Sequence, residues 1–231
     1  MNCSVASVPR AAAPLPGTGA RRLRKAALAL VACLGLVAPC LSADWALSES
    51  QRKLLSTGAI VAEGDLAVDK AVADIRAAVQ VNATPEQVFR TLTDCARALR
   101  FVPHLKRCAV LETAPDGSWQ DVQHHVDYGW LAPRADYVFH AEYNGFESIR
   151  FSNVRGDFHE NRGTWEFQPL EGGHGTLVTY QARVAPAFYV PRWMMRSMIR
   201  RDLPELMRGL RAYAESTRAP AATKPDNPPG P

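Results

Sequence analysis

Residues 190–216 read VPRWMMRSMIRRDLPELMRGLRAYAES, and this stretch decides the predicted fold. Its apolar residues recur in steps of three and four, which is the spacing of one face of an α-helix. Pro204 lies inside the pattern and predicts a kink or a division of the helix. The apolar stripe consists of Met195, Ile199, Leu203, Leu206, Leu210 and Tyr213. Such a helix has to bury its stripe against another element.

The residues before this helix predict that the other element is an antiparallel sheet. From residue 107 apolar and polar residues alternate, which is the period of half-covered β-strands. Turn sequences such as APDG, NG and EGGHG separate the alternating segments. Five consecutive strands joined by short turns are therefore expected, at residues 121–130, 134–143, 147–154, 164–167 and 176–184.

The first half of the chain predicts two further strands and three short helices. Residues 58–64 and 72–83 have strand character, and residues 47–55 form a short helix. In ATPEQVFRTLTD, residues 83–94, Thr84 stands at the N-cap, followed by Pro85 and by Gln87 three positions later. This is a capping box with proline in the first turn, so a helix begins here. A second helical turn follows in residues 96–102 and ends before Pro103.

Net charge argues against a nucleic-acid partner. The chain has 231 residues and a net charge of +4, but residues 1–43 hold five basic residues and no acidic one. The remainder has 22 basic and 23 acidic residues, which is not the charge of a nucleic-acid-binding protein.

Residues 1–43 have the order of a secretory signal. RRLRK is followed by an uncharged apolar run of 14 residues and then by CLSAD, so cleavage is expected after Ala43. The run is shorter than the roughly 20 residues of a membrane-spanning helix. The chain is therefore expected to be exported, periplasmic or secreted. Two alternatives stay open: a lipid anchor at Cys33, the last residue of the segment LVAC (residues 30–33), and an uncleaved membrane anchor.

Export affects the interpretation of the cysteines. Only Cys95 and Cys108 belong to the expected mature domain, and an even number in an oxidising compartment favours a disulfide. Two buried free thiols are the alternative. Neither cysteine belongs to a CxxC pair, so no metal site is predicted.

Four segments in sequence resemble the START-like, or SRPBCC, superfamily. They are VNATPEQVFRTLTD, VDYGWLAPRADYVF, RGTWEFQPLEGGHGTLVTYQARVAP and VPRWMMRSMIRRDLPELMRGLRAYAE. The polyketide cyclase/dehydrase and coenzyme Q-binding branch is the most similar. The resemblance implies an α+β helix-grip fold, in which a curved antiparallel sheet of about six to seven strands wraps around the C-terminal helix and encloses a hydrophobic pocket.

The domain organisation follows from these patterns. Residues 1–43 are the signal peptide, 44–56 a helical lead-in, 57–217 the START-like domain and 218–231 a disordered tail rich in proline and alanine.

The implied pocket defines the candidate ligand-binding residues. Methionine adapts to irregular partners, and the predicted helix carries several beside its apolar stripe. Aromatic residues of the predicted strands would face them. The expected lining residues are Met194, Met195, Met198, Ile199, Leu203, Leu206, Trp130, Tyr137, Phe139 and Phe151.

Candidates for catalysis are few. His124 and His125 are neighbours on a strand, so they point to opposite faces, and one of them could face the pocket. Arg134 and Asp136 share strand parity and could pair at its mouth. Tyr137 completes the weak candidates His124, His125, Arg134 and Tyr137; solvated or structural roles are the alternative for each. No motif indicates a cofactor.

Two functions are consistent with these features. The first is a non-catalytic binding protein for a lipid, a quinone or a polyketide-like molecule. The second is a cyclase or aromatase that acts on a poly-carbonyl substrate in the same pocket. A third possibility is an adaptor that uses only the surface of the fold. Arg192, Arg196 and Arg200 form a basic stripe that could contact an anionic membrane, or simply be solvated.

Overall fold

The computed structural model describes residues 45–67, 72–131, 134–173 and 175–216. The predicted signal peptide and the predicted tail lie outside these residues. The described strands are β1 (Val61–Leu66), β2 (Ala73–Val81), β3 (Leu105–Thr113), β4 (Trp119–Val126), β5 (Ala135–Asn144), β6 (Ser148–Gly156), β7 (Phe158–Pro169) and β8 (Thr176–Pro186). The described helices are α1 (Glu49–Ser56), α2 (Pro85–Thr93), α3 (Cys95–Phe101), the 3-10 helix η1 (Gly129–Leu131) and α4 (Arg192–Ser216).

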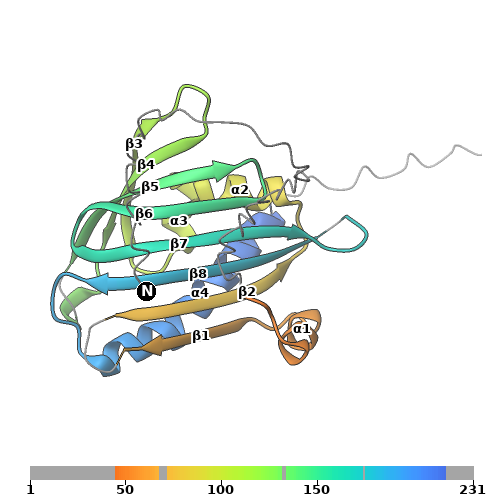
Figure 1. Cartoon of the computed structure of the whole chain (residues 1–231), viewed down its shortest axis with the longest axis horizontal. Helices are drawn as coiled ribbons and strands as arrows, with labels where there is room; N and C mark the ends of the chain where they lie inside the picture. The colour runs from red at the N-terminus through yellow and green to blue at the C-terminus, as the bar shows by residue number, and fades with distance from the viewer. Residues whose placement is uncertain (1–44, 68–71, 132–133, 174, 217–231) are drawn as a thin grey trace, which may run out of the picture. The chain divides into compact units, whose positions relative to one another are not determined.

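The strands form one antiparallel sheet in the order β1-β2-β8-β7-β6-β5-β4-β3. Strands β3 to β8 follow one another as a meander, and β2 pairs with the last of them, with Val79 opposite Val178. The chain passes from β2 to the far edge of the sheet through α2 and α3. Figure 1 shows α4 running along one face of the sheet, behind β1, β2 and β8. This is the helix-grip arrangement with a curved sheet.

The described sheet has eight strands, where the sequence predicts about six to seven. The additional strand is β3, which pairs only with β4 at the edge of the sheet. Its pairing shifts register between Leu105 and Arg107 and again between Val110 and Glu112. An edge strand with two irregularities does not show a clean period of two, because its side chains are not alternately buried.

Helix α4 continues through Pro204 as one helix, so the predicted division of the helix at this residue is wrong. Leu203 and Leu210 of the predicted stripe are buried, and Met207, which the stripe does not include, is buried between them at spacings of four and three. Met207 and Leu210 have no exposed surface and share a core with Val79 and Val178 of the sheet.

The two helices of the crossover are positioned by their caps. The hydroxyl of Thr84 accepts from the Gln87 amide, and the Gln87 side chain accepts from the Thr84 amide, so the predicted capping box of α2 is confirmed. The Asp94 carboxylate caps α3 by accepting from the amides of Ala96 and Arg97. Both helices contact α4, and together with it they border the cavity described next.

Candidate ligand-binding cavity

A cavity of about 360 Å³ lies between α4 and the sheet. This volume falls within the range of small-molecule sites. Apolar side chains form most of its wall. Eight of the ten residues predicted to line it do so: Met195, Met198, Ile199, Leu203, Leu206, Tyr137, Phe139 and Phe151.

The other two predicted lining residues lie elsewhere. Trp130 is 93% exposed and belongs to η1, because β4 ends at Val126 and Gly129 turns the chain with φ 70°. Its predicted strand parity therefore does not apply. Met194 is buried in one cluster with the cavity-lining residues Met195, Val190 and Ala73, but it does not itself border the cavity. Met194 and Met195 diverge because successive helical residues point about 100° apart.

The two adjacent histidines lie on opposite sides of β4, as predicted. His124 lines the cavity, whereas His125 does not. His125 Nδ1 lies 2.7 Å from Asp136 Oδ1 on the exposed side of the neighbouring strand. His125 therefore does not face the cavity and cannot contact a ligand there.

Arg134 also lies away from the cavity wall. Its Nε is 3.1 Å from the Asp127 carboxylate, and the side chain is 72% exposed. The predicted pairing of Arg134 with Asp136 is wrong, because β5 begins only at Ala135 and Asp136 is engaged by His125. An ion pair this exposed contributes at most about 1 kcal/mol to stability.

His124 and Tyr137 form a hydrogen-bonded pair in the cavity wall. His124 Nδ1 lies 3.2 Å from Tyr137 Oη, on neighbouring strands in direct register. Burial lowers the pKa of His124 to about 4. Burial also raises the pKa of Tyr137 well above its usual value. Both groups are therefore uncharged near neutral pH, and the pair can exchange hydrogen bonds with a neutral polar group.

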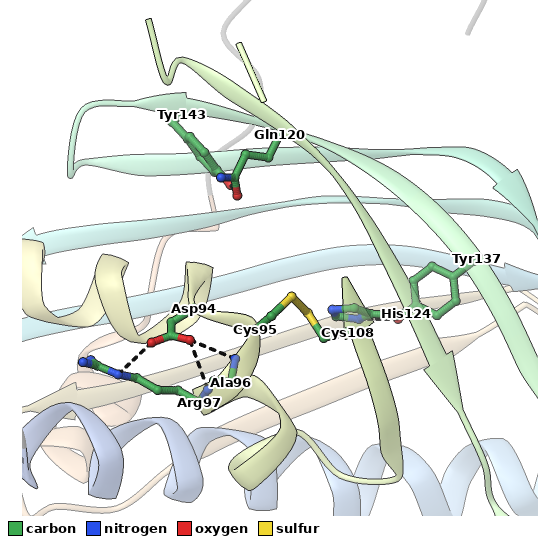
Figure 2. Close-up of a disulfide and its surroundings, with 9 residues drawn as sticks. All are labelled: Asp94, Cys95, Ala96, Arg97, Cys108, Gln120, His124, Tyr137 and Tyr143. Atoms are coloured by element: carbon green, nitrogen blue, oxygen red, sulfur yellow. Dashed lines mark hydrogen bonds and ion pairs between the residues drawn. A yellow bond between two sulfur atoms is a disulfide. The ribbon is translucent and has the colours of Figure 1, made fainter. Parts of the chain in front are cut away.

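A disulfide closes the cavity beside this pair. Cys95 at the start of α3 is bonded to Cys108 on β3, and the two Cα atoms are 5.2 Å apart. Both cysteines border the cavity, and Cys108 lies directly opposite His124 in the sheet. Figure 2 shows the His124 ring beside Cys108, with Tyr137 beyond it. Of the two alternatives for the cysteines, the structure has the disulfide.

Several polar residues of the wall are not singled out by the sequence patterns. They are Asn161, Tyr180, Tyr128 and Asp202. Tyr180 belongs to a predicted strand, and its shared parity with Ala182 is visible in the sequence. Asn161 precedes the segment recognised as a strand, because β7 extends from Phe158 to Pro169 rather than over residues 164–167 alone. Asp202 and Tyr128 reach the cavity from separate elements, which no local pattern reveals.

Asp202 places a carboxyl group in the cavity wall. His104 Nε2 lies 3.5 Å from Asp202 Oδ2, and the His104 ring packs against Tyr128 with centroids 4.4 Å apart. Burial raises the pKa of the Asp202 carboxyl. Burial also raises the pKa of Tyr128, and the nearby Asp202 adds to that effect.

The described residues contain no group of three His, Cys, Asp or Glu side chains arranged to hold a metal ion. In the same part of the chain, no helix combines the length and hydropathy needed to cross a membrane.

The buried state of His124 predicts a pH dependence of stability. An unfolded histidine has a pKa of about 6.5. Between about pH 6.5 and 4 the unfolded chain takes up a proton at this position and the folded chain does not, so the free energy of unfolding falls as the pH falls. A His124→Gln variant keeps an uncharged polar group and should lose less stability over this interval.

Urea unfolding followed by circular dichroism at several pH values measures this difference. The other histidines are present in both proteins, so the comparison isolates His124. Parallel curves of stability against pH for the two proteins would contradict the prediction.

A sheet that grips a C-terminal helix and encloses an apolar cavity defines a helix-grip domain with room for a hydrophobic molecule. The chain belongs to the family described as polyketide cyclase / dehydrase and lipid transport, which matches residues 81–211, more than half of the chain. It is thus a member of the START-like, or SRPBCC, superfamily.

Solved structures show the same fold. A STAR-related lipid transfer protein from Xanthomonas axonopodis is 19% identical with a TM-score of 0.57, over 67% of this chain and 93% of that one. Human StAR-related lipid transfer protein 5 is 14% identical with a TM-score of 0.55, over 68% and 82%. The Zhui aromatase/cyclase from Streptomyces sp. R1128 is 14% identical with a TM-score of 0.53, over 62% and 94%. No curated protein sequence matches the chain.

Proposed function

We propose that this protein is an exported, non-catalytic binding protein for a hydrophobic small molecule such as a lipid, a quinone or a polyketide-like compound. The observation that carries the proposal is the apolar cavity between α4 and the sheet. Burial of apolar ligand surface contributes about 25 cal/mol per Å², so such a cavity needs few polar contacts to bind.

Export is supported by the order of residues 1–43 and by the disulfide. Disulfides persist in oxidising compartments, which favours a periplasmic or secreted protein. A lipid anchor or an uncleaved anchor at the N-terminal segment is the alternative, and the mass of the protein recovered from cells distinguishes the three.

The chemistry of the wall favours binding over catalysis. His124 is the imidazole that borders the cavity, and its pKa of about 4 makes it a weak base near neutral pH. General acid–base catalysis works best when the pKa lies near the working pH. Tyr137, whose pKa is raised, holds its proton more tightly than a free phenol.

The protein purified from its own cells is expected to carry a bound hydrophobic molecule. Native mass spectrometry should detect the complex, and solvent extraction should release the ligand unchanged. Met198→Trp places a large ring at a position that lines the cavity and should abolish the complex. Arg208→Trp adds the same ring to an exposed position of α4 and serves as the control. A protein that is empty and also refuses a panel of lipids and quinones would overturn the proposal.

A cyclase or aromatase is the second candidate function. The His124–Tyr137 pair favours it, because this pair could donate a hydrogen bond to a carbonyl oxygen inside the cavity. The Zhui aromatase/cyclase has the same fold. Incubation with a poly-carbonyl probe separates the two functions, because a cyclase returns a dehydrated or cyclised product whereas a binding protein returns the probe unchanged.

We also propose that the start of α4 contacts an anionic membrane during ligand exchange. Arg192, Arg196 and Arg200 are exposed along α4 at intervals of four residues, and Arg192 also donates to the Ala67 carbonyl. Trp193 is 63% exposed beside them. Basic residues next to an exposed tryptophan are typical of membrane interfaces.

Replacing Arg192, Arg196 and Arg200 with glutamate should strongly reduce binding to vesicles of anionic phosphatidylglycerol. Each basic residue near such a surface contributes about 1 kcal/mol. Arg150, Arg155 and Arg162 are exposed on β6 and β7, so their replacement with glutamate makes the same change in net charge elsewhere. Co-sedimentation with vesicles measures both variants. Equal losses in the two variants would mean that only net charge matters, and the proposed contact would be wrong.

A further inference from the structure

Several polar side chains of the cavity wall make no hydrogen bond to a described residue, and Asn161 and Tyr180 are two of them. Asn161 is 9% exposed and borders the cavity, yet its amide makes no hydrogen bond to any described residue. Tyr180 is partly buried, and its hydroxyl likewise makes no hydrogen bond to a described residue; burial raises the pKa of Tyr180, so the hydroxyl keeps its proton. Buried polar groups in native proteins almost always have a hydrogen-bond partner. Both groups border the cavity, so its contents can supply a hydrogen-bond partner for each of them.

The two groups belong to neighbouring strands on the same side of the sheet. Asn161 on β7 lies opposite Val184 of β8, and Tyr180 of β8 lies opposite Trp165 of β7. Gly163 stands between these positions, and the Phe151 ring occupies the space where its side chain would be. The Tyr180 ring stacks against Phe151 with centroids 6.1 Å apart. Tyr128 and Tyr137 line the same cavity, so these three phenol groups border one volume.

The charges around this volume disfavour an anionic ligand. Among the described residues that line the cavity, none is lysine or arginine. Asp202 supplies a carboxyl group, and the nearby imidazole of His104 is already engaged by it. His124 is uncharged near neutral pH. A carboxylate brought into this cavity would lose its hydration without gaining a positive partner.

We propose that the cavity selects uncharged hydrophobic molecules that carry a hydroxyl or carbonyl oxygen, with Asn161 and Tyr180 as the recognising groups, and that it rejects carboxylates. This inference rests on the proposed binding function and names its ligand class. An amide and a phenol can each donate to a carbonyl or hydroxyl oxygen, and the amide oxygen can also accept from a hydroxyl group.

The test uses the full-length protein and four probes that share one skeleton: naphthalene, 2-naphthol, methyl 2-naphthoate and 2-naphthoate. Binding is measured from probe fluorescence at a pH of about 7.5, where the acid is a carboxylate. 2-Naphthol and the methyl ester should bind. 2-Naphthoate should bind at least about tenfold more weakly than its methyl ester, because the carboxylate is charged and loses its hydration in the cavity, whereas the ester is neutral.

A pair of variants tests the role of Tyr180. Tyr180→Phe removes the unpaired hydroxyl and should weaken 2-naphthol binding about three- to tenfold, with naphthalene binding unchanged. Tyr213→Phe is the matched control, because Tyr213 is a partly buried tyrosine of α4 that packs against the core and is not among the cavity-lining residues. That variant should leave 2-naphthol binding unchanged.

The outcomes separate this inference from the function on which it rests. If none of the probes binds, naphthalene included, the proposed binding function fails and the inference fails with it. If the probes bind but 2-naphthoate is held as tightly as its methyl ester, or if Tyr180→Phe binds 2-naphthol as well as the unaltered protein does, the inference is overturned and the binding function stands.

Discussion

Leu210→Ala is expected to lower the free energy of unfolding by about 2–5 kcal/mol. Leu210 is fully buried on the face of α4 that packs against the sheet, in the same core as Met207, Val79 and Val178. Its truncation removes apolar burial and leaves a void that the surrounding strands can fill only in part. Urea unfolding followed by circular dichroism measures the loss.

Two comparisons make this prediction specific to packing. Leu54→Ala shortens a leucine of α1 that is 53% exposed and should change stability by less than about 0.5 kcal/mol. Leu206→Ala should cost less than Leu210→Ala, because Leu206 is only partly buried and already borders the open cavity. A loss for Leu210→Ala no larger than that for Leu54→Ala would mean that α4 is not held as the structure describes.

Removal of the disulfide between Cys95 and Cys108 is expected to lower the free energy of unfolding by about 3 kcal/mol. The two cysteines are separated by 13 residues, and the bridge restricts the unfolded chain across that loop. The loop contains α3 and the start of β3, both of which border the cavity. The Cys95→Ala/Cys108→Ala double variant and chemical reduction should therefore produce similar losses in urea unfolding.

The control for this prediction is the double variant with reductant. Reductant should destabilise the unaltered protein and leave the double variant unchanged, because the remaining cysteines, Cys3, Cys33 and Cys40, lie in the N-terminal segment. An unaltered protein that keeps its stability under reduction would contradict the prediction.

Much of the fold could be predicted from local patterns. The period of α4, the capping box at Thr84 and the alternation in β4 to β8 depend on residues close together in sequence, and each of these elements is present. Strand β3 could not be counted from its pattern, because it lies at the edge of the sheet and its register shifts twice. The pairing of β2 with β8 likewise could not be predicted from local patterns, because the two strands are distant in sequence.

The site was predictable to a smaller degree. The stripe of α4 identifies Met195, Ile199 and Leu203 as cavity-lining, since a helix has to turn its apolar face inward. Trp130 was predicted from strand alternation that ends four residues earlier, at Val126. Arg134 was predicted to pair with Asp136 because the two residues would share one face of a strand. Strand β5 begins only at Ala135, so this parity does not apply to Arg134.

The amino-acid sequence by itself determined the helices and most of the strands of this protein, because hydrophobic periodicity and capping act over a few residues and need no distant contact; the helix-grip class followed from the resemblance of four segments to a known superfamily. Only the tertiary structure decided which side chains border the cavity, that His124 faces it while His125 binds Asp136, and that Asn161 and Tyr180 border it without a hydrogen bond to any described residue. These properties depend on strand register and on the approach of α4, which together bring residues distant in sequence around one volume.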